Sequence, residues 1–83
     1  MYLTGYCSYC QAALRLLEQK GVTDIEKIRV DLEPARRAEM SARSGQRTVP
    51  QIWIGGRHVG GCDELYALED SGKLDSLLTG TAA

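Results

Sequence analysis

The chain has 83 residues, a net charge of −1 and 43% hydrophobic residues, which predicts one small globular domain over residues 1–83. The balanced charge argues against a nucleic-acid partner, and no apolar run approaches the roughly 20 residues that span a bilayer. The first residues lack a secretory signal and three cysteines are few for a disulfide scaffold, so we expect a cytoplasmic protein whose thiols serve catalysis or metal binding.

The first part of the chain predicts a strand, a helix and a second strand. Residues 2–3 end a short strand, and residues 8–20 predict a helix that stops at Gly21, where a left-handed cap fits. One face of this helix carries apolar residues at spacings of three and four, namely Cys10, Ala13, Leu14 and Leu17. Residues 25–30 then predict a second strand because polar and apolar residues alternate at its end.

The middle of the chain predicts a second helix and a hairpin. Pro34 suits the first turn of a helix that runs to about residue 44 and ends at Gly45. Residues 49–54 predict a third strand, and Gly55-Gly56 predicts a two-residue turn of the primed type. The turn leads into a short antiparallel fourth strand at residues 57–60.

The last part of the chain predicts two helices. Residues 61–71 open with acidic side chains in the first turn, residues 73–78 form a short amphipathic helix, and residues 79–83 are expected to fray. The order β-α-β-α-β-β-α predicts an α/β sandwich with one parallel strand pair and one hairpin.

The most informative motif is Cys7-Ser8-Tyr9-Cys10, two thiols at the start of a predicted helix. A helix N-terminus presents unpaired N–H groups and a partial positive charge, which favour a thiolate over a thiol. Cysteines in this setting ionise at roughly pH 3.5–7.5 instead of ~8.5. We therefore expect Cys7 to be the nucleophile, because a Cys-x-x-Cys motif beside a β-α-β unit is typical of thioredoxin-like redox proteins.

Three blocks of sequence, in this order and spacing, resemble the glutaredoxin family over nearly the whole chain. They are Tyr6-Cys7-Ser8-Tyr9-Cys10, residues 44–54 (Ser-Gly-Gln-Arg-Thr-Val-Pro-Gln-Ile-Trp-Ile), and residues 58–65 (His-Val-Gly-Gly-Cys-Asp-Glu-Leu). The resemblance is to the small bacterial dithiol type. It implies an α/β thioredoxin fold with a four-stranded mixed sheet flanked by helices, glutathione as the reducing partner, and a cis peptide before Pro50.

The resemblance also implies roles for individual residues. Cys7 would be the nucleophile and Cys10 the resolving thiol, with Tyr9 beside the glutathione groove. The backbone of Thr48-Val49-Pro50 would pair with glutathione as an added strand does. Gly61-Cys62-Asp63 would hold the γ-glutamyl end, through helix N–H groups for its carboxylate and the Asp63 side chain for its ammonium. Arg47 or Gln46 would bind the glycyl carboxylate.

Two positions depart from the family pattern. Ser8 stands where many members have proline, and some members with Cys-Ser-Tyr-Cys assemble a [2Fe-2S] cluster between two subunits with glutathione as an extra ligand. A cluster dimer with Cys7 as ligand is therefore an alternative to a monomer with no tightly bound cofactor. Thr4 stands where the family often has lysine, whose ammonium would have favoured the thiolate and the glutathione carboxylate.

Other interpretations compete at two residues and at one possible metal site. Cys7, Cys10, His58 and Cys62 could supply the four ligands of a zinc site, although no second paired cysteine motif is present. Cys62 fits a buried structural role or a regulatory thiol, and His58 fits an ordinary, partly exposed strand residue.

The predicted function is a glutathione-dependent oxidoreductase that reduces disulfides and glutathione mixed disulfides of client proteins.

Overall fold

The computed structural model describes residues 1–79, and its elements follow the predicted order. The strands are short: β1 (Tyr2–Leu3), β2 (Ile28–Arg29), β3 (Ile52–Ile54) and β4 (Arg57–Gly60). The helices are α1 (Ser8–Gln19), α2 (Pro34–Ser44), α3 (Cys62–Asp70) and α4 (Leu74–Thr79). Of the tail expected to fray, residues 80–83 lie outside the described part, and Thr79 ends α4.

The strands form two ladders joined through β1. Strands β1 and β2 are parallel, with Tyr2 opposite Ile28, and β3 and β4 are antiparallel. An antiparallel bridge between Tyr2 and Gln51, the residue before β3, connects these two two-stranded sheets, which places the strands in the order β2-β1-β3-β4. The predicted four-stranded mixed sheet is thus present as two two-stranded sheets that a single bridge connects.

Two predicted strands are longer than the observed ones, and each has a physical reason. Residues 25–30 pair with β1 only from Ile28 onward, because β1 offers two residues as partners. The Val30 N–H also donates to the Leu3 carbonyl, and the Met1 ammonium donates to the Glu26 carbonyl at 2.8 Å. Residues 49–54 begin their pairing at Gln51, because Pro50 has no N–H to donate. The Val49–Pro50 peptide is cis, as the family resemblance implies.

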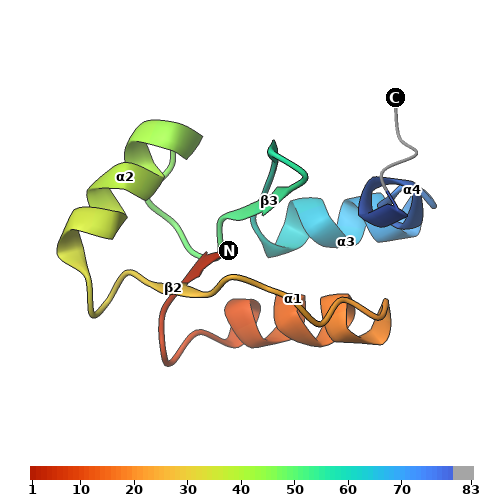
Figure 1. The fold of residues 1–83 in the computed structure, drawn as a ribbon, viewed down its shortest axis with the longest axis horizontal. Helices are drawn as coiled ribbons and strands as arrows, with labels where there is room; N and C mark the ends of the chain where they lie inside the picture. Colours follow the sequence, from red (N-terminus) through yellow and green to blue (C-terminus); the bar gives the residue numbers. More distant parts are fainter. Residues whose placement is uncertain (80–83) are drawn as a thin grey trace.

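The helices cover both faces of the sheet (Figure 1). On one face α1, α3 and α4 pack against β3 through six buried residues: Ala13, Leu16, Leu17, Ile52, Leu65 and Leu74. On the other face α2 contributes Met40, which packs with Tyr2 and Val30. The predicted apolar face of α1 is buried as expected.

Local sequence signals set the ends of the helices and the hairpin turn. Gly21 and Gly45 have positive φ values of 83° and 72°, which glycine adopts without a Cβ penalty. Gly55 and Gly56 also have positive φ, as a primed turn requires. Within residues 1–79, no helix combines the length and the apolar character that crossing a bilayer demands.

Candidate active site

Cys7 is the N-cap of α1, with extended backbone angles of φ −114° and ψ 112°. Its Sγ accepts a hydrogen bond from the Cys10 backbone N–H at 3.2 Å, and its carbonyl accepts one from the Gln11 N–H. The side chain is half-buried, and Sγ also lies 3.8 Å from the Val49 carbonyl oxygen. The sulfur therefore sits at the N-terminus of α1 and receives one of the helix N–H groups that have no carbonyl partner within the helix.

Cys10 lies one turn further into α1 and is completely buried. Burial, followed by a hydrogen bond to Cys7, raises the pKa of the Cys10 thiol to about 12. Negative charge on Cys7 raises this pKa further, whereas a hydrogen bond with the Thr4 backbone opposes the shift. The two thiols are thus unequal: one reaches solvent at a helix start, and the other is held protonated beneath it.

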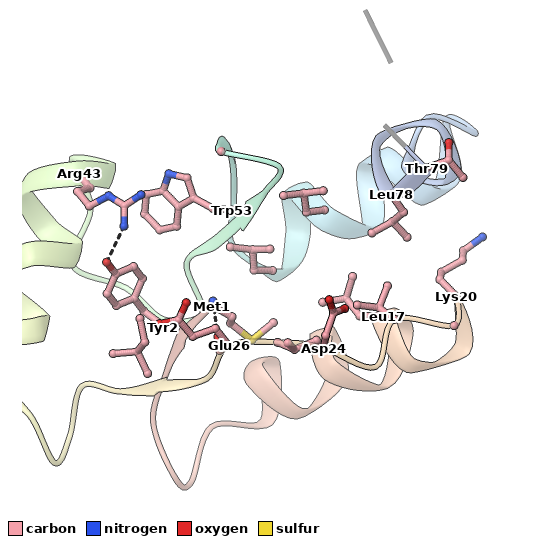
Figure 2. Close-up of a pocket in the computed structure, with 17 residues that line it drawn as sticks. Met1, Tyr2, Leu17, Lys20, Asp24, Glu26, Arg43, Trp53, Leu78 and Thr79 are labelled. Carbon is pink, nitrogen blue, oxygen red and sulfur yellow. Dashed lines mark hydrogen bonds between the residues drawn. The ribbon is translucent and has the colours of Figure 1, made fainter. Parts of the chain in front are cut away.

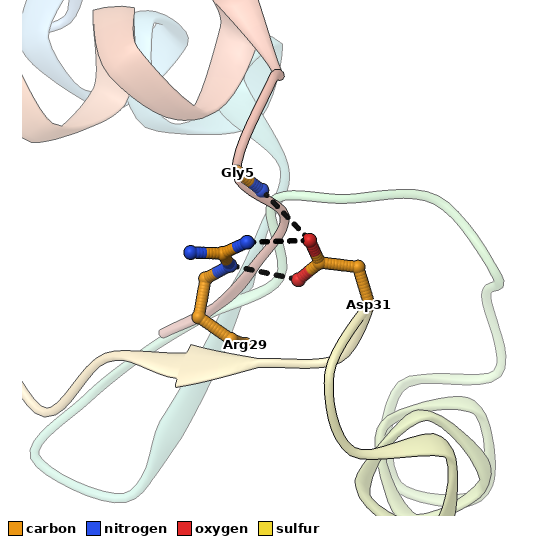
Figure 3. A network of polar contacts seen from close by, with 3 residues as sticks. All are labelled: Gly5, Arg29 and Asp31. Atoms are coloured by element: carbon orange, nitrogen blue, oxygen red, sulfur yellow. Dashed lines mark hydrogen bonds and ion pairs between the residues drawn. The ribbon is translucent and has the colours of Figure 1, made fainter.

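The turn before Cys7 is tied to the end of β2 by a polar network (Figure 3). Asp31 accepts two hydrogen bonds from the Arg29 guanidinium, at 2.8 and 2.6 Å, and one from the Gly5 N–H at 3.3 Å. The Arg29 guanidinium, with help from the Gly5 amide, holds the pKa of the Asp31 carboxyl well below its ordinary range. The network connects β2 to the chain segment that delivers Cys7 to its helix.

A groove of about 360 Å³ is bounded by three chain segments. Cys7 does not line it, but Val49 does, and the Val49 carbonyl oxygen lies 3.8 Å from Cys7 Sγ. One wall comes from the first turn of α1, one from the loop before β3, and one from the start of α3. The lining residues are Tyr9, Gln46, Thr48, Val49, Pro50, Gly61, Cys62, Asp63 and Glu64.

The wall formed by α3 offers backbone N–H donors and the Asp63 carboxylate. The N–H groups of Cys62 and Asp63 are the first two of the helix and have no carbonyl one turn earlier within it. The Gly61 N–H is already used, because it donates to Glu64 Oε1 at 3.2 Å. A Cβ at position 61 would lie 3.3 Å from the Pro50 carbonyl oxygen, so glycine allows the two walls to approach.

Cys62 lines this groove but is itself buried. Burial is the main cause of the raised pKa of its thiol, and the negative charges of Asp63, Cys7 and Glu64 add to it. A thiol that is held protonated is a poor nucleophile. The geometry therefore favours a structural role for Cys62 over a second reactive thiol.

A second cavity in the protein has a volume of about 650 Å³ (Figure 2). It is bordered by Met1, Leu17, Trp53 and Leu78, together with the segment that follows α1. Neither Cys7 nor Cys10 lines it.

The structure brings most of the expected groove residues together. Seven of the residues assigned to glutathione line the groove: Tyr9, Thr48, Val49, Pro50, Gly61, Cys62 and Asp63. Of the two residues proposed for the glycyl carboxylate, Gln46 lines the groove and Arg47 does not. Arg47 is exposed, and its carbonyl accepts a hydrogen bond from Arg37.

Sequence reasoning missed Glu64 and gave no role to a buried amide, Gln51. A glutamate three residues after Gly61 has capping-box spacing, a signal that could have placed Glu64 at this wall. The four-ligand zinc site is not formed, because within residues 1–79 no three His, Cys, Asp or Glu side chains are placed to hold a metal ion.

Comparisons with known proteins identify the family. A glutaredoxin family model matches residues 1–59. The chain is 54% identical to a glutaredoxin of Pseudomonas aeruginosa over 79 residues, covering 95% of this chain and 93% of that protein. It is 49% identical to glutaredoxin 3 of Escherichia coli over 78 residues, covering 94% of this chain and 93% of that protein.

Solved structures give the same result. A buckwheat glutaredoxin–glutathione complex superposes with a TM-score of 0.87 at 38% identity, covering 99% of this chain and 78% of that one. A solution structure of glutaredoxin from Brucella melitensis superposes with a TM-score of 0.83 at 54% identity, covering 99% of this chain and 89% of that one. With its paired cysteines and thioredoxin fold, the chain belongs to the glutaredoxin family.

Proposed function

We propose that this protein, a glutathione-linked thiol redox protein by family, reduces protein disulfides and glutathione mixed disulfides. The observation that carries the proposal is the inequality of the two thiols. Cys7 is partly exposed at a helix N-terminus, and Cys10 is buried with its pKa raised to about 12. We further propose that the protein acts as a single-domain monomer in the cytoplasm.

The reaction begins at Cys7. Its thiolate attacks one sulfur of the substrate disulfide, forming a Cys7 mixed disulfide, and the other sulfur leaves as a thiolate that takes up a proton. In the dithiol route Cys10 loses its proton and attacks the Cys7 sulfur, which releases the reduced substrate and leaves a Cys7–Cys10 disulfide. Two glutathione molecules then reduce this disulfide and become glutathione disulfide.

In the monothiol route the mixed disulfide is between Cys7 and glutathione. A second glutathione thiolate attacks the glutathione sulfur, which releases Cys7 as a thiolate and forms glutathione disulfide. This route does not need Cys10. It does need the groove, because the bound glutathionyl group must present its sulfur to the incoming thiolate.

The groove supplies complementary groups for glutathione, whose complex with a buckwheat relative supports this assignment. The Asp63 carboxylate suits the γ-glutamyl ammonium, and the N–H groups of Cys62 and Asp63 suit the adjacent carboxylate. The extended backbone of Thr48-Val49 suits pairing with the tripeptide. Gln46, on the groove wall, is the better placed candidate for the glycyl carboxylate.

Activity measurements on cysteine variants test the proposal. Reduction of a glutathionylated peptide, coupled to glutathione reductase, is measured for the wild type, Cys7→Ser and Cys10→Ser. We expect Cys7→Ser to be inactive and Cys10→Ser to retain measurable deglutathionylation. Equal loss in the two variants would contradict the monothiol route, and an inactive wild type would contradict the proposed function.

A second candidate function is a [2Fe-2S] dimer with glutathione as a ligand. It is supported by the exposure of Ser8 beside the partly exposed Cys7, while the buried Cys10 is unsuited to ligation. In such a dimer each subunit would supply Cys7. Anaerobic reconstitution with iron, sulfide and glutathione tests it, since a colourless monomer on gel filtration would eliminate the cluster.

A further inference from the structure

Gln51 is a completely buried amide at the centre of the sheet. Its Nε2 donates to Gln46 Oε1 and to the Thr48 carbonyl, both at 3.0 Å, and lies 3.3 Å from Thr48 Oγ1. On its other side Oε1 lies 2.8 Å from His58 Nε2. The amide therefore connects β4 to two residues on the groove wall, although neither Gln51 nor His58 lines the groove.

The orientation of this amide is fixed by its partners. The Thr48 carbonyl can only accept, so the Gln51 atom that faces it must be the donor Nε2. Oε1 must then face His58, and an amide oxygen can only accept. His58 consequently carries a proton on Nε2 and donates it to Gln51.

The imidazole is held in place by the aromatic ring beside it. The rings of His58 and Trp53 lie 4.5 Å apart between centroids, and the Arg43 guanidinium lies 4.6 Å from the Trp53 centroid. Trp53 also contacts Tyr2 edge to face. Trp53 on β3, which itself packs against Arg43 on α2, thus fixes the orientation of the His58 donor.

We infer that His58 and Gln51 are positioning residues for glutathione binding, because together they hold Gln46 and Thr48 in place on the groove wall. This inference rests on the proposed glutathione groove. If the His58 donor is lost, Gln51 Oε1 is buried without a partner, which costs more than the hydrogen bond itself is worth. The amide would then rotate or shift toward water, and Gln46 and Thr48 would lose their common anchor.

The expected consequence is weaker binding without a change in chemistry. The net contribution of one hydrogen bond corresponds to about a 3- to 10-fold change in an equilibrium constant. We therefore expect KM for a glutathionylated peptide to rise by about this factor when the donor is removed. The value of kcat should stay near that of the wild type, because Cys7 and its helix are untouched.

Two variants distinguish the effect of the His58 N–H donor from the effect of its aromatic ring. His58→Phe keeps an aromatic ring against Trp53 and removes the donor, whereas His58→Gln removes the ring and restores an N–H group at a similar reach. Arg57→Leu, at an exposed neighbouring position on β4, is the matched control. We expect KM to rise in His58→Phe, to return toward the wild-type value in His58→Gln, and to be unchanged in Arg57→Leu.

An inactive wild type would show that the proposed function fails, and this result is distinguishable from failure of the inference about His58 and Gln51. With an active wild type, an unchanged KM in His58→Phe, or an equal rise in His58→Phe and His58→Gln, would overturn the inference. A measurement on the unaltered protein covers the case in which His58→Phe does not fold. Nitrogen-15 NMR of neutral His58 should show the Nε2–H tautomer, and the Nδ1–H tautomer would overturn the inference.

Discussion

The buried thiol of Cys10 should resist alkylation in the reduced protein far more strongly than an ordinary cysteine does. Its pKa is raised to about 12, against an ordinary value of 9.0, mainly by burial and by its hydrogen bond to Cys7. At pH 9 this leaves about one molecule in a thousand as thiolate, compared with about half for an ordinary thiol. Ionisation alone then slows alkylation by about 500-fold, and steric burial adds to the effect.

Removal of Cys7 should relieve part of this protection. Cys7→Ala eliminates the hydrogen bond and the negative charge that raise the pKa of Cys10, while burial, the largest cause, remains. The pKa of Cys10 should therefore fall but stay above the ordinary value. In the proposed reaction Cys7 is held in a neutral mixed disulfide before Cys10 attacks. The variant imitates that state and tests whether the pKa of Cys10 falls in it.

Iodoacetamide labelling measures both effects. Wild-type and Cys7→Ala protein are labelled at several pH values, quenched and digested, and the modification of each cysteine is quantified by mass spectrometry, with urea-unfolded protein as the reference. Cys10 should label slowest in the wild type, faster in Cys7→Ala, and fastest when unfolded. Labelling of Cys10 in the folded wild type at the rate of Cys7 would refute the reasoning.

Three further substitutions test other parts of the structure. The stabilisation from the Asp31 carboxylate is present above its ordinary pKa of 3.8 and is lost as the pH falls below it. The free energy of unfolding of Asp31→Asn, measured by circular dichroism, should therefore fall less steeply with decreasing pH than that of the wild type. Asp63→Asn should raise KM for a glutathionylated peptide by about 3- to 10-fold, because the proposed charge-assisted contact with the γ-glutamyl ammonium would be lost; an unchanged KM would place the ammonium elsewhere. Tyr2→Phe removes a hydroxyl that donates to Glu39 at 2.6 Å and accepts from Arg43 at 2.9 Å, so urea unfolding should show a loss of about 0.5–1.5 kcal/mol, and an unchanged midpoint would contradict the role of this hydroxyl.

The helices could be predicted from the sequence because their signals are local. Pro34 and Gly45 bound α2 as predicted, and the apolar spacing of α1 matches its buried face. The strand lengths could not be predicted in the same way. They depend on which backbone groups find a partner across the sheet, and the partners of β2 and of Gln51, the residue before β3, lie far away in sequence.

The candidate site followed from three motifs, but the contacts between them did not. The resemblance assigned Thr48 and Asp63 to one ligand, and the structure places them on two walls of the same groove. The link from His58 to Thr48 through Gln51 has no sequence signature, because a buried amide in a strand looks like a polar residue on a solvated face. The choice between Gln46 and Arg47 also needed coordinates, since adjacent loop residues point in different directions.

Trapping the glutathionyl intermediate tests the central claim most directly. Cys10→Ser protein is treated with glutathione disulfide, and the adduct is located by mass spectrometry and by amide chemical-shift changes. The account predicts one glutathionyl group on Cys7, with the largest shift changes at Thr48, Val49 and Asp63. An adduct on Cys62, or shift changes confined to the cavity beside Met1, would contradict it.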